Sequence, residues 1–190
     1  PVEFASAGDR QVLLVRRFDR QVDAGGAVTR HLYASAHTVL RLDAQTRGER
    51  QRSYVAFAHE IRRWCGQAGV DPGAIQRELW RRMAFNALCG NGDDHPRNHG
   101  LLHAQGGWGL APAFDIAPSL TFSGTLAMAI TRDGSAFATP ENLLATCGSF
   151  AYAPAEAAAF LESAKDTIAS GWGDELAACG QRRDLLPAPS

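Results

Sequence analysis

The sequence predicts a mainly helical domain of the α+β class, with one strand near its start and a short β-hairpin near its middle. A buried strand is predicted at residues 11–15, an apolar run rich in branched side chains. Helices are predicted at 53–65 and from residue 71 to about 88, where apolar residues recur at helical spacing behind a capping residue. Two short segments, 101–103 and 106–110, are joined by a glycine-containing turn and predict the hairpin.

The first third of the chain offers few helical signals. The predicted strand follows the turn residues Gly8 and Asp9, and a polar loop is expected around Gly25 and Gly26. Residues 35–42 show a weak helical pattern.

Two helix starts are well marked. Ser53 can cap a helix whose apolar residues include Tyr54 and Ile61, and Gly66 stands where that helix would end. Asp71 followed by Pro72 is a second start, because Asp accepts free amides and proline suits the first helical position.

The last third is predicted to be helical. A short helix is expected to open at Thr139–Pro140 and to end near Gly148, and a longer one to run from Pro154 to Gly171. The tail 185–190 carries two prolines and is expected to fray.

Composition excludes several classes of protein. The chain has 190 residues, 45% hydrophobic and 21% charged, which suits one large globular domain of 1–184 plus the tail. No apolar run approaches the roughly 20 residues that cross a bilayer, and no secretory signal opens the chain, so cytoplasm is the default location. The net charge of -1 does not indicate direct nucleic-acid binding. The four cysteines form no CxxC pair and are interpreted as buried free thiols.

The segment 86–100 concentrates polar chemistry between glycines. Asp93 is followed five positions later by Asn98, the interval between the catalytic Asp and the metal-binding Asn of the kinase loop. A short irregular loop can aim the first residue at a substrate hydroxyl and the second at a phosphate-bound Mg²⁺. After the predicted hairpin, Asp115 follows Phe114 as a lone acid, which is the position of the Mg-binding Asp in the D-F-G segment of a kinase.

A metal-dependent hydrolase is the rival interpretation of the same loop. His99 and His103, with the nearby Asp93, Asp94 and His95, offer imidazole and carboxylate ligands suited to zinc or manganese. That interpretation leaves Asn98 and Asp115 without a role.

Three strings resemble the C-terminal domain of HipA-like serine/threonine kinases, the toxins of type II toxin–antitoxin systems. They are LVRRFDR at 14–20, FNAL at 85–88 leading into NGDDHPRNHG at 91–100, and LAPAFDIAPS at 110–119. The resemblance covers about 12–172 and implies a kinase-like large C-terminal lobe, with the early strand as the hinge between lobes.

The resemblance also implies roles for single residues. Asp93 corresponds to the catalytic base, Asn98 and Asp115 to the metal ligands, and His95 to a neighbour of the phosphates. Arg16, Phe18 and Asp19 lie in the segment that would hold the nucleotide, with Asp19 reaching the ribose or simply pairing with an arginine. Asp94 receives no role.

At the level of the whole protein, the resemblance implies ATP and Mg²⁺ as cofactors and a protein substrate, in known cases an aminoacyl-tRNA synthetase. A DNA-binding antitoxin would be the partner. A kinase also needs a glycine-rich loop over the phosphates and a lysine that binds them, and neither precedes the hinge here. The single lysine is Lys165, which lies in a late helical segment. We therefore expect a catalytic lobe that is weak or inactive alone; the alternative is a non-catalytic module that docks an antitoxin or client.

Overall fold

The computed structural model of the chain describes residues 2–8, 10–43, 50–119 and 121–178, which form an α+β fold. Its strands are β1 (Val2–Ala7), β2 (Arg10–Val15), β3 (Arg20–Val22), β4 (Val28–Arg30), β5 (Leu32–Ser35), β6 (Gly100–Ala104) and β7 (Gly107–Leu110). Its helices are α1 (Ala36–Val39), α2 (Tyr54–Trp64), α3 (Pro72–Cys89), α4 (Pro140–Thr146) and α5 (Pro154–Ala178), with the 3₁₀ helix η1 (Cys147–Phe150) before α5.

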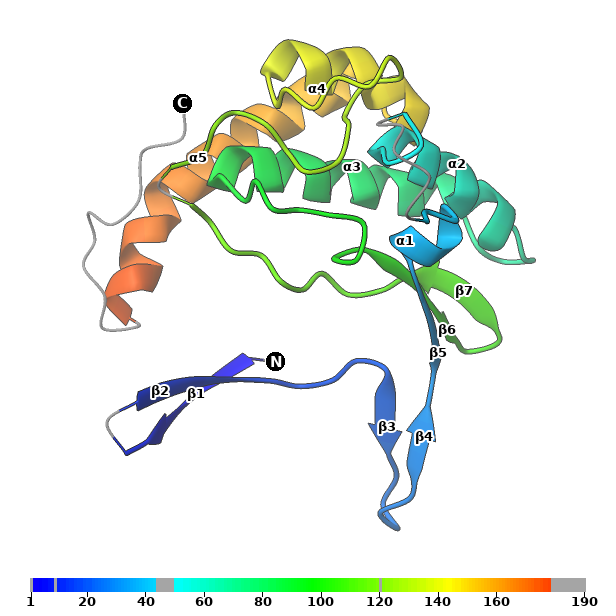
Figure 1. Ribbon diagram of the computed structural model, residues 1–190, viewed down its shortest axis with the longest axis vertical. Coiled ribbons are helices and arrows are strands. Elements are labelled where there is room, and N and C mark those ends of the chain that lie inside the picture. Colours follow the sequence, from blue (N-terminus) through cyan, green and yellow to red (C-terminus); the bar gives the residue numbers. More distant parts are fainter. Residues whose placement is uncertain (1, 9, 44–49, 120, 179–190) are drawn as a thin grey trace.

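The strands form three small antiparallel sheets. β1 pairs with β2, β3 pairs with β4, and a three-stranded sheet has the order β5-β6-β7. Figure 1 shows β1 to β4 set apart from the helices, with β5 leading up into the helical body beside β6 and β7. The chain beyond β7 crosses between α3 and the early strands, so this side of α3 is where the loop segments gather.

The helix starts are those that the sequence predicts. The Ser53 side chain accepts the amide of Ala56 at the start of α2, and the Asp71 side chain accepts the amide of Gly73 at the start of α3. Thr139 caps α4 in the same way. Capped ends and an apolar face together confirm the predictions of α2, α3 and α4.

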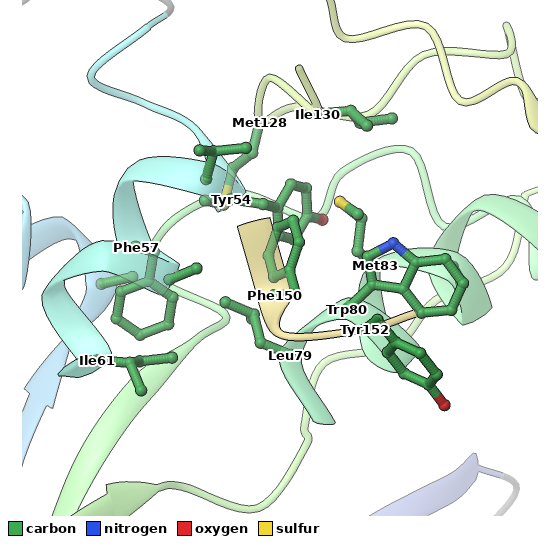
Figure 2. Close-up of a cluster of buried hydrophobic side chains, with 14 of the residues drawn as sticks. Tyr54, Phe57, Ile61, Leu79, Trp80, Met83, Met128, Ile130, Phe150 and Tyr152 are labelled. Carbon is green, nitrogen blue, oxygen red and sulfur yellow. The ribbon is translucent and has the colours of Figure 1, made fainter. Parts of the chain in front are cut away.

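The core lies where α2, α3, η1 and α5 meet. Figure 2 shows Phe150 between Phe57 and Ile61 of α2 on one side and Trp80 and Met83 of α3 on the other. All five side chains are fully buried. Burying a large apolar side chain contributes about 1.5–3 kcal/mol, so this cluster fixes α3 and the loop that follows it.

Several predictions of extent were wrong. α5 continues through Gly171 to Ala178, because a single glycine costs a helix only about 1 kcal/mol. The predicted loop around Gly25 and Gly26 is confirmed as the turn of the β3–β4 hairpin, whose two strands were not predicted, and in this turn the Asp23 carboxylate accepts two amides. The helix expected at 35–42 is limited to α1 and follows strand β5, which was not predicted.

Two smaller predictions fall partly outside the described residues. Cys65 and Cys147 are buried free thiols, as predicted, and burial raises the pKa of Cys65 to about 11. Cys89 is a half-buried free thiol, whereas Cys179 and the tail 185–190 lie outside the described residues. Among the described helices, none is long and apolar enough to span a membrane.

Candidate active site

The loop after α3 is built from tight turns. α3 ends at Gly90, whose φ of 74° is left-handed and sends the chain back across the helix end. The His95 amide then donates to the Asp93 carbonyl over 2.9 Å, and the Asn98 amide donates to the His95 carbonyl over 2.9 Å. The two turns leave Asp93 exposed and Asn98 buried.

Asn98 has a defined orientation within this loop. Its Nδ2 donates to the Asp93 carbonyl oxygen over 3.3 Å. The side-chain carbonyl oxygen is therefore the atom left to face a ligand.

Asp93 lies at the edge of a pocket of about 330 Å³. Hydroxyl-bearing side chains line much of it, and apart from Asp93 the described lining carries no charge. The lining residues are Gly92, Asp93, Ala117, Ser119, Thr121, Phe122, Ser123, Thr125, Leu126 and Ala127. A carboxylate beside an open polar pocket can meet the hydroxyl of an incoming group.

Asp115 stands in irregular chain after β7 and is exposed. Its φ of 57° is left-handed, a conformation that costs a non-glycine residue about 1 kcal/mol or more and gathers at functional sites. The segment is held at both ends: Arg82 of α3 donates to the Ala111 carbonyl over 2.7 Å, and the Ser119 amide donates to the Gly90 carbonyl over 3.1 Å.

The structure brings the Asn98 and Asp115 segments together. Asn98 and both neighbours of Asp115, Phe114 and Ile116, line one small cavity of about 20 Å³, about the room of a single water. Asp115 itself does not line this cavity, whereas the cationic Arg82 does. The case for Mg²⁺ therefore rests on the donor types, because the side-chain oxygens of Asn98 and Asp115 are the kind of ligand that Mg²⁺ prefers.

Of the three residues predicted to hold the nucleotide, Arg16, Phe18 and Asp19, Phe18 contacts the Asp115 segment. The Phe18 ring packs on Phe114 with centroids 5.6 Å apart, which places the connection between β2 and β3 beside the Asp115 segment. Asp19 accepts two hydrogen bonds of 2.7 Å from Arg17, and this contact lowers the pKa of Asp19. Of the alternatives for Asp19, the structure shows the arginine pairing, and Arg16 is exposed nearby.

His95 lies on the same loop and is half-buried. Its Nδ1 is shielded from solvent and has no hydrogen-bond partner among the described residues. Its place beside the phosphates stays a prediction of the sequence.

Asp94, which received no role from the sequence, is the centre of a buried hydrogen-bond network. Its Oδ2 accepts from the Tyr54 hydroxyl of α2, from Asn86 Nδ2 of α3 over 2.6 Å and from His99 Nε2 over 2.8 Å. Burial, and next the Asp94 charge, raise the pKa of Tyr54 well above its usual value, so Tyr54 remains a donor. The sequence carried one signal for this network: Asn86 lies three positions after Met83, so the helical spacing puts a polar side chain on the buried face of α3.

A metal centre for hydrolysis finds no support in the described part of the chain. No three His, Cys, Asp or Glu side chains among these residues are grouped to hold an ion. The His99 ring is engaged by Asp94, and the His103 ring stacks edge-on against Trp108 with centroids 5.3 Å apart.

A second cavity of about 420 Å³ lies between α3, α4 and α5. Leu88, Leu143 and Leu161 contribute to its apolar wall, and Lys165 lies at its edge. The predicted position of Lys165 in a late helix is confirmed. Phe122 lines both this cavity and the pocket beside Asp93.

Comparisons with known proteins show which proteins this chain is similar to. A relative from Sinorhizobium fredii (strain NBRC 101917 / NGR234), named "Putative kinase Y4mE", is 29% identical over 124 residues, which are 64% of this chain and 29% of that protein. A chain of the Shewanella oneidensis MR-1 toxin–antitoxin complex of HipA, HipB and operator DNA has the same fold, with a TM-score of 0.75 and 20% identity.

The coverage of these matches is unequal. The Shewanella match takes in 93% of this chain and 45% of that one, so the chain spans less than half the length of the two relatives it matches. The profile of the HipA-like C-terminal domain matches residues 1–172. The chain therefore belongs to the HipA-like C-terminal domain family.

Proposed function

We propose that this chain is the catalytic lobe of an ATP- and Mg²⁺-dependent serine/threonine protein kinase of the HipA-like toxin type, with the lobe spanning 1–184. The observation that carries the proposal is the convergence at the end of α3. An exposed Asp93 borders a polar pocket. Asn98, from the same loop as Asp93, lines a small cavity together with the two neighbours of Asp115, Phe114 and Ile116.

The proposed chemistry assigns one task to each acid. Asp93 orients the acceptor hydroxyl and takes its proton as the oxygen bonds to the γ-phosphorus and ADP leaves. Asn98 and Asp115 would hold Mg²⁺, which when bound supplies charge neutralisation on the triphosphate. Since the site offers no covalent intermediate, positioning and electrostatic stabilisation supply most of the rate.

The nucleotide is proposed to extend toward the early strands. Phe18 contacts Phe114, so the segment of Arg16, Phe18 and Asp19 lies close enough to the Asp115 segment to hold the adenosine part. The Asp19 carboxylate, which accepts from Arg17, would also have to accept a hydrogen bond from a ribose hydroxyl. His95 is proposed to stand on the phosphate side.

Phosphoryl transfer by this chain alone is proposed to be weak or absent. The single lysine, Lys165, lies in α5 at the edge of the apolar cavity, so it does not serve the α- and β-phosphates in this proposal. The remaining grip on the phosphates would come from residues of the complete protein outside this chain.

The proposed partners follow the relatives. A DNA-binding antitoxin is proposed because the Shewanella structure joins HipA with HipB and operator DNA. A cytoplasmic protein, such as an aminoacyl-tRNA synthetase, is proposed as the substrate on the family resemblance. A lobe that only docks such partners is the second candidate; it predicts no dependence of any activity on Asp93.

The experiment uses the complete gene product and calorimetric titration with ATP, with and without Mg²⁺, beside a phosphoryl-transfer assay. Asp93→Asn should reduce transfer by about 10²–10⁴-fold and leave Mg-ATP affinity unchanged, because a general base acts on the acceptor. Asp115→Ala should weaken Mg-ATP binding itself. Asp166→Asn, an exposed acid on α5, is the control that should alter neither. Equal losses of binding in Asp93→Asn and Asp115→Ala would refute the division of roles.

A further inference from the structure

A chain of buried side chains connects the Asp93 loop to the Asp115 segment. It begins at Asp94, which accepts from Asn86 Nδ2 over 2.6 Å. Asn86 Oδ1 accepts from Asn91 Nδ2 over 3.1 Å, and Asn91 Oδ1 accepts from the amide of Ala117 over 3.4 Å. The three side chains are 1–3% exposed, so water is kept from the bonds between Asp94, Asn86 and Asn91, whereas the last bond reaches the exposed residue Ala117.

The direction of these hydrogen bonds is fixed from both ends. An ionised carboxylate only accepts, so Asn86 must turn its NH₂ group to Asp94 and its carbonyl oxygen to Asn91. Asn91 must then turn its own NH₂ group to Asn86 and its oxygen to Ala117. The amide of Ala117 only donates, so the far end requires the same orientation.

The start of this chain is rigidly held. Asp94 also accepts from Tyr54 of α2 and from His99 before β6, so two further elements fix it. The backbone adds to this, because the Asn91 amide donates to the Asn86 carbonyl over 2.9 Å. Asn91 is thus placed by the core of the lobe.

The far end of the chain acts close to Asp115. Backbone bonds from Ser119 to Gly90 and from Ala127 to Gly92 hold the later part of the segment against the loop. The bond to Ala117 lies nearer, two positions after Asp115, whose backbone is left-handed. Losing it frees the part of the segment that carries the acid.

We propose that Asn91 is a positioning residue for Asp115, oriented by Asp94 through Asn86, and that it sets where the Asp115 carboxylate stands relative to Asn98. What Asp115 holds there rests on the proposed function. The placement itself does not, so the two are tested separately.

Placement is tested on this chain without any ligand, by NMR measurement of amide hydrogen exchange. Asn91→Leu should speed exchange at Ala117 by about tenfold, as expected for the loss of one part-buried hydrogen bond. Gln76→Leu is the matched control: Gln76 is also a buried α3 amide, bonded to Ala58 and Arg62, and its loss should leave Ala117 unchanged. If Asn91→Leu does not fold, Asn91→Ser is the milder variant. Unchanged exchange at Ala117 in a folded Asn91 variant would overturn the proposal.

Function is tested in the complete protein by a double-mutant cycle on the KM for Mg-ATP. Asn91→Leu should raise this KM about tenfold, within the range of coupling between neighbouring residues, and change kcat less. In an Asp115→Asn background it should add no further rise, because its effect passes through Asp115. The same factor in both backgrounds would mean an independent structural role and would overturn the positioning role.

The outcomes separate the two proposals. If Asp115→Asn leaves the KM unchanged, the metal role of Asp115 fails, and the exchange at Ala117 still decides the placement. If Asp115→Asn raises the KM and Asn91→Leu does not, the proposed function stands and the role of Asn91 fails.

Discussion

Asp93 and Asp94 are adjacent carboxylates with opposite surroundings. Asp93 is exposed beside an open pocket, whereas Asp94 is 2% exposed and accepts three hydrogen bonds on one oxygen. Burying a charge is costly unless such donors compensate for lost water. The first acid is thus free for chemistry, and the second fixes the loop that carries it.

Removing one donor from Asp94 should therefore lower stability more than removing a similar hydroxyl elsewhere. Tyr54→Phe deletes the hydroxyl that reaches Asp94 and leaves a buried acceptor short of one partner. We expect a loss of about 1–3 kcal/mol in the free energy of unfolding, measured by urea denaturation.

Tyr152→Phe is the control for this substitution. The Tyr152 hydroxyl accepts from Arg81, which is exposed and can bind water instead, so the expected loss is below about 1 kcal/mol. Equal losses in the two variants would contradict a special role for the Asp94 network.

The turn at the end of α3 is a critical point at the scale of elements. Gly90 has a φ of 74°, and a Cβ there would meet the Ser119 carbonyl oxygen at 3.0 Å and Phe122 Cβ at 3.2 Å. Gly90→Ala should therefore cost about 1–2 kcal/mol for the backbone and more for displacing the neighbouring segment.

Gly124 separates these two contributions. Its φ of 77° matches that of Gly90, but a Cβ there would meet nothing within 4 Å. Gly124→Ala should therefore show the backbone cost alone in thermal denaturation. A Gly90→Ala loss no larger than that of Gly124→Ala would show that contact with the neighbouring segment is unimportant.

Elements with local signals were predictable from the sequence. The starts of α2, α3 and α4 follow from one capping residue each, and the β6–β7 pairing stands where glycines predict a turn. Strands β1, β3, β4 and β5 were not predicted. The partner of β5 is β6, and such a distant pairing leaves no mark on neighbouring residues.

At the scale of the molecule, the sequence allowed candidate site residues to be named but not the hydrogen-bond network that connects them. Asp93, Asn98 and Asp115 follow from spacing and resemblance, and the structure brings the loop and the Asp115 segment together. The network of Asp94, Asn86 and Asn91 depends on which side chains α2 and α3 bury against each other. That information comes from packing and not from spacing.

The early strands should be the least protected part of the molecule. β1 and β2 contact mainly each other, and Leu13, Leu14 and Val15 are 49–58% exposed. The strand predicted at 11–15 is thus present as β2, but the prediction that it is buried was wrong, because no helix of the described residues packs over it. Few buried contacts mean a low cost of local opening. We expect the β1–β2 amides to exchange with solvent at least about tenfold faster than the buried α2 and α3 amides, measured by hydrogen-exchange mass spectrometry.

Slow exchange in β1–β2, equal to that of α3, would contradict this expectation for the chain alone. The complete protein provides the comparison. Protection that appears only there would show that residues outside this chain cover the hairpin.

The distant pairing of β5 has a consequence for biosynthesis. Ser35 pairs with Gly100, so β5 leaves the ribosome well before its partner exists. At roughly 5–20 residues per second, translation leaves this strand edge unpaired for several seconds. Leu32, 66% exposed even in the finished fold, stands on that edge, so until β6 appears the nascent chain presents an open strand with which another chain can pair.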